Sequence, residues 1–485
     1  MNLVCKTVAL CLLLSTMGSP ALAQSPETNA RIQRVTEGLL PPTRVAGRDY
    51  EPQTLEDLMA ETGVPAVSIA VINEGRIEWT RAWGLADAAS GQIATTDTLF
   101  QAASISKAVV ATAALDMVED GLLSLDAPVN DALRGWTIPE NDLTEGHPVT
   151  LRHLLAHTSG LTVGGFPGYP EDAPVPNVEQ ILDGVPPANT PRVEVDQTPG
   201  SARRYSGGGF TVLQLLMSQH ENLAFPALIQ TRVLSPAGMI ASAFDQPLAE
   251  DRRALAATGY DDRGEPVAGR FHTYPELAAA GLWTTPTDLA RWVLAISDAF
   301  NGRSNAILER ETARAMLTRD PWGQGLGLVV RDAPELEFSH GGANEGYRAL
   351  VVGLPDRGQG VVIMTNGDNG QVITSAVVLA VAEEYGWSWR QPRMITPVPL
   401  PAETMGAFAG QYDGTPNLIV TVAVSPDGDS LLLTVADNPA LEFIPQGDDG
   451  FIDTAGRARL TFERDEDGTV TAAIANGQRL PRRHP

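Results

Sequence analysis

The chain of 485 residues holds 43% hydrophobic and 19% charged residues, the balance of a globular protein, and its length suits two or three domains. This composition excludes collagen, a coiled coil and wholesale disorder. Acidic residues outnumber basic ones by 59 to 34, so the net charge is −25 and the surface repels phosphate backbones and anionic lipid headgroups. We therefore predict neither nucleic-acid binding nor polybasic membrane association.

The first segment has the three-part composition of a secretory signal peptide. Lys6 precedes an apolar stretch from Val8 to Leu14, and Ala21-Leu22-Ala23 supplies a small-x-small cleavage site. That stretch is too short to span a bilayer, and no later run reaches the roughly 18 apolar residues of a membrane helix. We expect residues 1–23 to be removed and the protein to be exported without stable membrane insertion, most simply into a bacterial periplasm.

Cysteine and histidine usage narrows the chemistry. Both cysteines, Cys5 and Cys11, lie inside the predicted signal, so the exported chain would hold no disulfide, cysteine nucleophile or cysteine-ligated metal. The histidines include no His-Glu-x-x-His pattern, and the one i, i+4 pair, His153 and His157, is more typical of a structural role. We predict no metal and no other cofactor. The sequence also lacks a Gly-x-Ser-x-Gly nucleophile elbow, which disfavours an α/β-hydrolase.

The exported chain begins with an acidic segment that we predict to be loose. Two strand-like runs, 64–71 and 77–83, follow on either side of Asn73-Glu74-Gly75, a pattern that predicts a β-hairpin. Apolar residues then recur at helical spacing from Ser104 to Glu119. Thr150 can cap a short helix that begins immediately after it.

The middle of the chain alternates between a long loop and regular elements. Eight prolines and no clear period over 162–200 predict a long loop, which in a compact domain usually forms a lid or a binding segment. A helical pattern resumes over 210–220, and Thr285-Pro286-Thr287-Asp288 has the cap, proline and acid of a helix start. Strand-like runs at 326–330, 347–352 and 360–365 precede an apolar helix over 372–382. Strands at both ends with helices between them predict one α/β domain whose sheet joins distant segments.

The composition changes at Pro397–Pro401. Beyond this point short strand-like runs alternate with Asp-Gly turns, a pattern typical of hairpins. The runs are 418–424, 431–435, 460–462 and 470–474, and the turns are Asp427-Gly428, Asp449-Gly450 and Asp467-Gly468. We predict a small antiparallel β-barrel or sandwich.

Ser104-Ile105-Ser106-Lys107 begins the helix predicted from residue 104. Positions i and i+3 share one helix face, so the Ser104 hydroxyl and the Lys107 amine can meet. A serine hydroxyl becomes a good nucleophile when a base takes its proton, and a lysine can do so when burial lowers its pKa. Alone the motif is weak, because Ser-x-x-Lys occurs by chance in many long chains.

Two further segments could complete a site. Tyr205 follows Thr198-Pro199-Gly200, and a tyrosine beside a lysine ammonium can carry a proton to a leaving group. Alone, a half-buried tyrosine at a glycine turn is the simpler interpretation. His340-Gly341-Gly342-Ala343 ends a strand-like run, where two glycines allow a substrate to approach the backbone closely. Alone, His340 would more often be a hydrogen-bonded structural histidine.

Together these elements resemble one family. Ser104-x-x-Lys107, Tyr205-Ser206 and His340-Gly341-Gly342 occur in the order and approximate spacing of the serine β-lactamase and penicillin-binding-protein superfamily. They are most similar to its class C β-lactamase-like branch, which includes D-aminopeptidases, DD-carboxypeptidases and short-chain esterases. Residues 154–161 look like a loop of the same branch. The resemblance covers about 55–387.

The resemblance implies a fold and a domain organisation. The expected fold class is α/β (α+β): a β-lactamase-like antiparallel sheet flanked by helices, with a helical subdomain, followed by a small antiparallel β-barrel. We predict a signal peptide over 1–23, a β-lactamase-like serine hydrolase domain over 24–396 and a lipocalin-like β-barrel domain over 401–485.

The resemblance also implies roles. Ser104 would be the acylated nucleophile, Lys107 the base that helps to activate it, and Tyr205 a second proton carrier that serves the leaving group and later water. His340 would stand where many relatives carry a lysine. Three strand residues would line the site beside it: Gly341, Gly342 and Ala343. The backbone N–H groups of Ser104 and Ala343 would form the oxyanion hole.

One position departs from the family pattern. Relatives commonly carry asparagine two residues after the tyrosine, and here that residue is Gly207. The missing amide would steady Lys107 and grip a substrate acylamide, so its absence weakens the case for β-lactam hydrolysis. The His-Gly-Gly element looks more like the peptidase and esterase side of the branch. We therefore rank D-amino-acid peptides and short acyl esters ahead of β-lactams.

The predicted function is an exported serine hydrolase that cleaves small amide or ester substrates through a Ser104 acyl-enzyme. One alternative is a class C-type β-lactamase, and another is a non-catalytic penicillin- or peptidoglycan-binding sensor that keeps the fold. Such a sensor would be free to lose Ser104, Lys107 or Tyr205, and all three are present. The expected partner is a small molecule or short peptide, with peptidoglycan-derived peptides as candidates. The sequence predicts neither the oligomeric state nor the role of the barrel.

Overall fold

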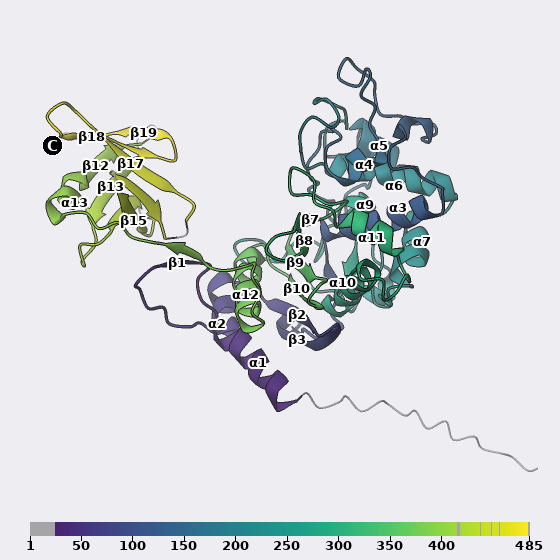
Figure 1. The fold of residues 1–485 in the computed structure, drawn as a ribbon, viewed down its shortest axis with the longest axis horizontal. Coiled ribbons are helices and arrows are strands. Elements are labelled where there is room, and N and C mark those ends of the chain that lie inside the picture. The colour runs from purple at the N-terminus through teal and green to yellow at the C-terminus, as the bar shows by residue number, and fades with distance from the viewer. Residues whose placement is uncertain (1–24, 415–417, 437, 448, 455, 484–485) are drawn as a thin grey trace, which may run out of the picture.

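The computed structural model describes residues 25–483 apart from 415–417, 437, 448 and 455. The predicted signal peptide therefore lies outside the described residues. Figure 1 shows two units, a larger one of sheet and helices and a smaller barrel to one side of it. None of the helices in this described part is long and apolar enough to cross a membrane.

The larger unit is built on a seven-stranded antiparallel sheet in the order β4-β3-β2-β10-β9-β8-β7. In chain order its strands are β2 Ala66–Asn73, β3 Arg76–Asp87, β4 Gln92–Ile93, β7 Val329–Arg331, β8 Glu337–Asn344, β9 Tyr347–Leu354 and β10 Gln359–Thr365. The β2–β3 hairpin is confirmed, and its turn residues Glu74 and Gly75 both have positive φ, as a tight two-residue hairpin turn requires. β2 also pairs with β10, Ala70 opposite Val362, so the sheet joins distant segments as predicted.

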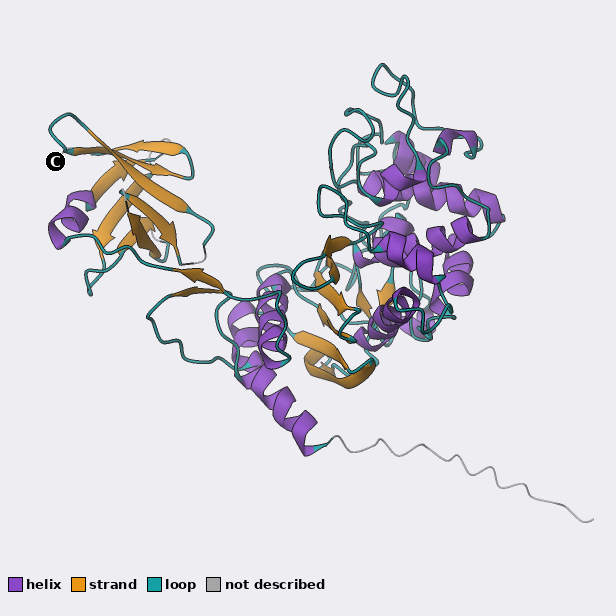
Figure 2. Cartoon of the chain, in the orientation of Figure 1, coloured by secondary structure: helices purple, strands orange, loops and turns teal. Residues whose placement is uncertain are grey.

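Helices cover both faces of this sheet (Figure 2). The helices are α1 Pro26–Glu37, α2 Leu55–Thr62, α3 Ile105–Glu119, α4 Leu151–Leu155, α5 Val178–Asp183, α6 Gly207–Glu221, α7 Phe225–Ile229, α8 Glu250–Arg253, α9 Leu277–Ala280, α10 Pro286–Phe300, α11 Arg310–Met316 and α12 Gly370–Glu384. α1, α2 and α12 pack together on one face, and α10 lies on the other beside α3, which also contacts β8 and β9. The predicted helix starts at Thr150 and Thr285 are confirmed, since each side chain accepts a bond from the third residue after it.

Two predictions about irregular segments are wrong. The acidic start is not loose: Ser25 caps α1, and the buried residues Ile32 and Val35 pack in the core beside α12. The 162–200 segment is not a continuous loop, because Asn177 and Gln180 form a capping box that begins the short helix α5. Both helices bury few side chains, so their hydrophobic period is too short to stand out in the sequence.

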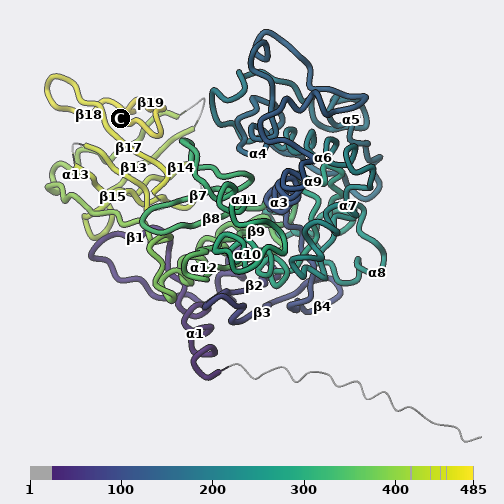
Figure 3. Tube along the Cα trace, turned by 45° about the vertical axis from the view of Figure 1, so that its right-hand side comes forward, coloured from purple at the N-terminus to yellow at the C-terminus, as the bar shows by residue number. Residues whose placement is uncertain are grey.

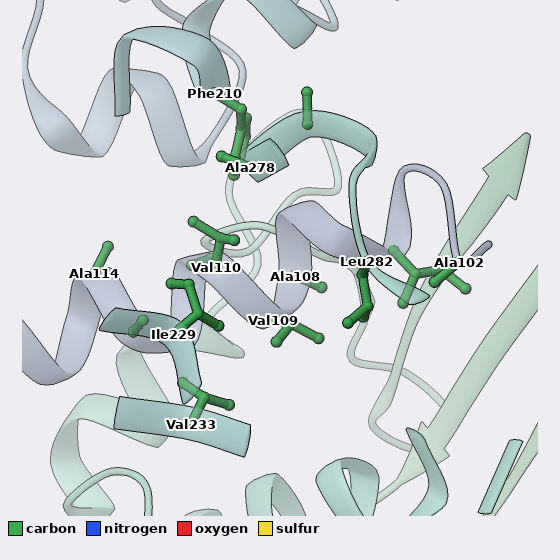
Figure 4. Packing of buried hydrophobic residues seen from close by; sticks show 14 of the residues in the cluster. Ala102, Ala108, Val109, Val110, Ala114, Phe210, Ile229, Val233, Ala278 and Leu282 are labelled. Atoms are coloured by element: carbon green, nitrogen blue, oxygen red, sulfur yellow. The ribbon is translucent and has the colours of Figure 1, made fainter. Parts of the chain in front are cut away.

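α3 is the central helix of the larger unit and carries the Ser-x-x-Lys motif. Almost every residue from Ile105 to Met117 is buried, and apolar residues lie all round the helix. Figure 4 shows Val109, Val110 and Ala114 of α3 packed near Ile229 and Val233. A helix buried on all sides is fixed in position by its neighbours. Its first turn is therefore a rigid platform.

The smaller unit is a nearly closed antiparallel barrel of eight strands in chain order. It consists of α13 Ala402–Phe408 and strands β12 Gly410–Asp413, β13 Ile419–Val424, β14 Leu431–Val435, β15 Leu441–Gly447, β16 Gly450–Asp453, β17 Arg459–Arg464, β18 Val470–Ala475 and β19 Gln478–Pro481. An antiparallel bridge joins Tyr412 of the first strand to Arg482, which immediately follows the last strand. Phe408 and Phe462 stack in its interior, and Phe451 meets both rings edge-on. The barrel prediction is confirmed.

A short parallel ladder joins the two units. β1 (Thr43–Val45) pairs with β11 (Arg393–Ile395), and Val45 and Ile395 pack against Ile444 and Ile452 of the barrel. Arg48 adds a bidentate contact to the Glu442 carboxylate, with distances of 2.9 and 2.8 Å. The turned view in Figure 3 shows the segment containing β1 beside the barrel. The segment before the first strand of the main sheet and the segment after its last strand thus jointly anchor the barrel.

Candidate active site

Ser104 stands at the start of α3 and is held there by short-range contacts. The preceding strand, β5 (Phe100–Gln101), pairs with β6 (Trp283–Thr284). Ala103 is fully buried with φ +50°, an uncommon left-handed backbone for a residue with a side chain. The Ser106 hydroxyl donates to the Ala103 carbonyl and accepts from the Leu282 N–H. These contacts fix the backbone on both sides of Ser104.

Lys107 lies one helical turn further along and points back to Ser104. Its Nζ is 3.1 Å from the Ser104 Oγ and 2.7 Å from the Ala279 carbonyl oxygen in α9. The side chain is 2% exposed, and both of these acceptors are neutral. The predicted i, i+3 meeting of hydroxyl and amine is therefore present, at a distance over which a proton can be transferred.

Tyr205 completes the cluster from the other side. The centroid of its half-buried ring lies 4.9 Å from the Lys107 Nζ. The ring stands between two histidines, with centroid distances of 4.3 Å to His157 and 6.3 Å to His340. Three segments that are far apart in the sequence thus meet around one lysine amine.

His340 is a buried, neutral member of this cluster. Its Nδ1 is 2.7 Å from the Gly341 carbonyl oxygen, which can only accept, so Nδ1 carries the proton and Nε2 is unprotonated. Burial lowers the pKa of His340 to about 4, and the nearby charges of Lys107 and Arg203 lower it further than the Gly341 contact raises it. At neutral pH the ring can accept a proton or a hydrogen bond.

β8 offers part of its edge to this cluster. Among the described strands, β7 pairs with β8 only from Glu337 to Ser339, so the edge is free of β7 from His340 onward. A β-carbon at Gly342 would come within 2.3 Å of the Ala102 carbonyl oxygen, which shows how closely β8 approaches the segment before Ser104. This close approach is at Gly342, whereas a β-carbon at Gly341 would lie 3.9 Å from the Ala349 carbonyl oxygen. The approach of a substrate to these glycines stays a prediction.

Comparison with known proteins identifies the family. The family model for beta-lactamase matches residues 52–383, more than half of the chain. The chain belongs to the beta-lactamase family. It is thus a serine hydrolase of the β-lactamase and penicillin-binding-protein superfamily.

Individual relatives agree with this assignment. A beta-lactamase of Escherichia coli K12 is 27% identical over 297 residues, covering 59% of this chain and 71% of the relative. Esterase EstB of Burkholderia gladioli is 47% identical over 98 residues, or 20% of this chain and 24% of the esterase. The octameric penicillin-binding protein homologue from Pyrococcus abyssi shares the fold, with a TM-score of 0.58 and 23% identity over 88% of this chain and 98% of that one.

Gly207 stands where the family resemblance leads us to expect asparagine. It begins α6, three residues earlier than the sequence predicts, because Ser206 caps the helix by accepting from the Gly209 N–H. A β-carbon at Gly207 would lie 2.8 Å from the Phe166 ring, and its N–H donates to the Gly164 carbonyl. The 162–166 segment thus packs directly on the start of α6, and a longer side chain at residue 207 would require the Phe166 ring to move.

Sequence reasoning missed His157, which it treated as structural. The ring is buried beside Tyr205, and its Nδ1 accepts the Ser206 N–H at 3.2 Å. Burial lowers the pKa of His157 well below its ordinary value, and the charges of Lys107 and Arg203, together with that of His340 when it is protonated, act in the same direction. The sequence offered one indication, namely that His157 lies in the 154–161 segment that resembles a loop of the family, but this resemblance does not indicate what the residue does.

Proposed function

We propose that this protein is an exported serine hydrolase that forms an acyl-enzyme at Ser104 and cleaves D-amino-acid peptides or short acyl esters. The observation that carries the proposal is the 3.1 Å contact between the Nζ of the buried Lys107 and the Oγ of the half-buried Ser104. Tyr205 lies beside the same amine. A nucleophile, a base within hydrogen-bond reach and a second proton carrier are the parts that acyl transfer needs.

In this mechanism Lys107 is the base, and its amine takes the Ser104 proton as the Oγ attacks the substrate carbonyl carbon. The negative charge on the carbonyl oxygen is stabilised by the backbone N–H groups of Ser104 and Ala343, and loss of one such donor typically costs about 10²–10³ in rate. The leaving amine or alcohol departs with a proton delivered through Tyr205. Water then attacks the ester, gives a proton to the same base system and releases the acid and Ser104.

The substrate preference follows from the region around α6. Gly207 offers no amide, and the 162–166 segment packs against that position. The stretch that is similar to an esterase also supports ester turnover. The edge of β8 beyond Ser339 suits a short extended substrate, such as a peptidoglycan-derived peptide. Export through a signal over 1–23, with a hydrolase domain over 24–396 and a lipocalin-like barrel over 401–485, is part of the same proposal.

The test combines labelling with turnover. Wild type should react with a serine-reactive fluorophosphonate, and Ser104→Ala should not. Ser297→Ala is the matched control, because that buried hydroxyl lies in α10 and donates to the Val293 carbonyl, and this variant should still be labelled. Circular dichroism checks the fold of each variant. Labelling that persists in Ser104→Ala would refute the proposal.

A substrate panel then separates the candidate reactions. It contains p-nitrophenyl acetate and butyrate, D-alanine p-nitroanilide, a D-Ala-D-Ala peptide and nitrocefin. Turnover of the D-configured amides or the esters supports the proposal. Efficient nitrocefin hydrolysis would instead favour the class C-type β-lactamase, and stoichiometric labelling without any turnover would favour the binding sensor.

A further inference from the structure

His157 contacts the backbone on both sides of Tyr205. The Arg204 N–H, which precedes Tyr205, donates to the His157 carbonyl oxygen at 2.8 Å. The Ser206 N–H, which follows Tyr205, donates to the His157 Nδ1 at 3.2 Å. The His157 ring also packs on the Tyr205 ring at 4.3 Å between centroids, tilted by 37°. One residue therefore contacts the N–H groups of both residues that flank Tyr205, and also the aromatic ring of this predicted proton carrier.

The backbone of His157 is adapted to this double contact. Its φ is +59°, in the left-handed region, and the residue is 2% exposed immediately after the end of α4. Among residues with side chains, asparagine, aspartate and histidine tolerate this region best. The loop is held from the other side as well, because the Thr158 N–H donates to the His153 carbonyl and the Gly200 N–H to the Thr158 carbonyl. Backbone strain that persists in a well-held loop is typical of functional sites.

The ring must be neutral to make these contacts. Nδ1 accepts the Ser206 N–H, so it carries no proton, and protonation would replace an attraction with a clash of two donors. The charged groups near the ring are Lys107 and Arg203, and both oppose a second positive charge, as would a protonated His340. An uncharged ring can therefore pack beside the lysine amine without competing for its protons.

We propose that His157 is a positioning residue for Tyr205, one that holds the tyrosine beside Lys107 without exchanging a proton with the substrate. The inference rests on the proposed function, in which Tyr205 carries the proton of the leaving group. A displacement of about 1 Å at a reacting group can cost on the order of 100-fold in rate. Loss of His157 should therefore lower kcat and leave KM nearly unchanged.

The test compares variants that keep different parts of the contact. His157→Phe keeps a ring and loses the acceptor, whereas His157→Asn tolerates the left-handed backbone and can place an oxygen near the position of Nδ1. With p-nitrophenyl butyrate we expect kcat to fall about 10–100-fold in His157→Phe and by less in His157→Asn. The matched control is His153→Asn, four residues earlier, where asparagine can replace histidine in the α4 capping box. It should stay close to wild type.

A double-mutant cycle decides whether His157 acts through Tyr205. In a Tyr205→Phe background, adding His157→Phe should lower kcat no further, because the group being positioned is already gone. An equal fractional loss in both backgrounds, or a rise in KM with kcat unchanged, would overturn the inference.

A second readout does not depend on turnover, so the inference and the proposed function can fail separately. In protein labelled with 13C-tyrosine, the Tyr205 signal is assigned by its loss in Tyr205→Phe. That signal should shift in His157→Phe and not in His153→Asn. An unmoved Tyr205 signal would overturn the positioning role even in an active enzyme. If the signal moves in His157→Phe but wild type shows no Ser104-dependent turnover, only the proposed function is refuted.

Discussion

Glu276 is a buried acid at the start of α9, the helix whose Ala279 carbonyl accepts from Lys107. Its side chain is fully buried, and neither carboxylate oxygen has a hydrogen-bond partner within the described part of the chain. Burial raises the pKa of Glu276 to about 8, from an ordinary value of 4.5. The native protein therefore keeps a proton at pH 7 that the unfolded chain releases.

Replacing Glu276 by glutamine tests this assignment through the pH dependence of stability. Between pH 4.5 and 8 the native state binds more protons than the unfolded state. As pH rises through this range, the free energy of unfolding of wild type therefore falls by up to about 1.4 kcal/mol per pH unit. Glutamine cannot ionise and removes this loss. Relative to wild type, the free energy of unfolding of the variant should rise by at most about 3 kcal/mol from pH 4.5 to pH 7. This difference should level off near 5 kcal/mol above pH 8.

The assay is urea unfolding followed by tryptophan fluorescence from pH 5 to 9. All eight tryptophans lie between residues 79 and 389, so the signal reports the larger unit and not the barrel. Glu56→Gln, an exposed position in the first turn of α2, is the matched control and should show no such trend. A difference between Glu276→Gln and wild type that is the same at pH 5 and pH 8.5 would refute the reasoning.

Three further predictions concern the site. His340 has a folded pKa of about 4, below the ordinary 6.5, so the free energy of unfolding of wild type falls as pH drops from 6.5 to 4, by at most about 3 kcal/mol. In urea unfolding, His340→Asn should flatten this pH dependence, and an unchanged pH dependence would contradict the prediction. Gly342→Ala places a β-carbon against the Ala102 carbonyl, so it should cost about 1–3 kcal/mol and slow fluorophosphonate labelling; a wild-type rate would refute this. Gly207→Asn alone should lower the melting temperature without raising nitrocefin turnover, because the Phe166 ring lies where the new side chain would go. Adding Phe166→Ala should recover stability in the double variant. A gain in nitrocefin turnover from Gly207→Asn alone would contradict this prediction.

The predictable parts of the fold are those with a long local period or a strong terminal signal. The β2–β3 hairpin, α3 and α10 each show one of these, and their predicted positions agree with the structure to within a few residues. The Ser-x-x-Lys spacing also predicts the contact that is found, because i and i+3 share a helix face. That Tyr205 and His340 join this contact came from the family resemblance, since no local rule brings residues about a hundred positions apart together.

The missed parts depend on tertiary contacts. α1 and α5 are stable because a few side chains dock on other helices, and residues 207–209 are helical although glycine is a poor helix former. There Ser206 supplies the cap, and the 162–166 segment covers the turn. The role of His157 depends on a left-handed backbone and on two N–H groups from a distant segment, neither of which a residue pattern encodes.

The pairing of β2 with β10 and of β1 with β11 has a consequence for biogenesis. A chain that emerges N-terminus first presents β2 early, but that strand must wait for residues 360–365 before its second edge is covered. The barrel anchor waits longer still, since 43–45 pairs with 393–395. The barrel itself is made of neighbouring hairpins and can fold without such a delay. Docking of the barrel on the β1–β11 ladder therefore comes late in folding, because it requires that both ends of the hydrolase sequence have been synthesised.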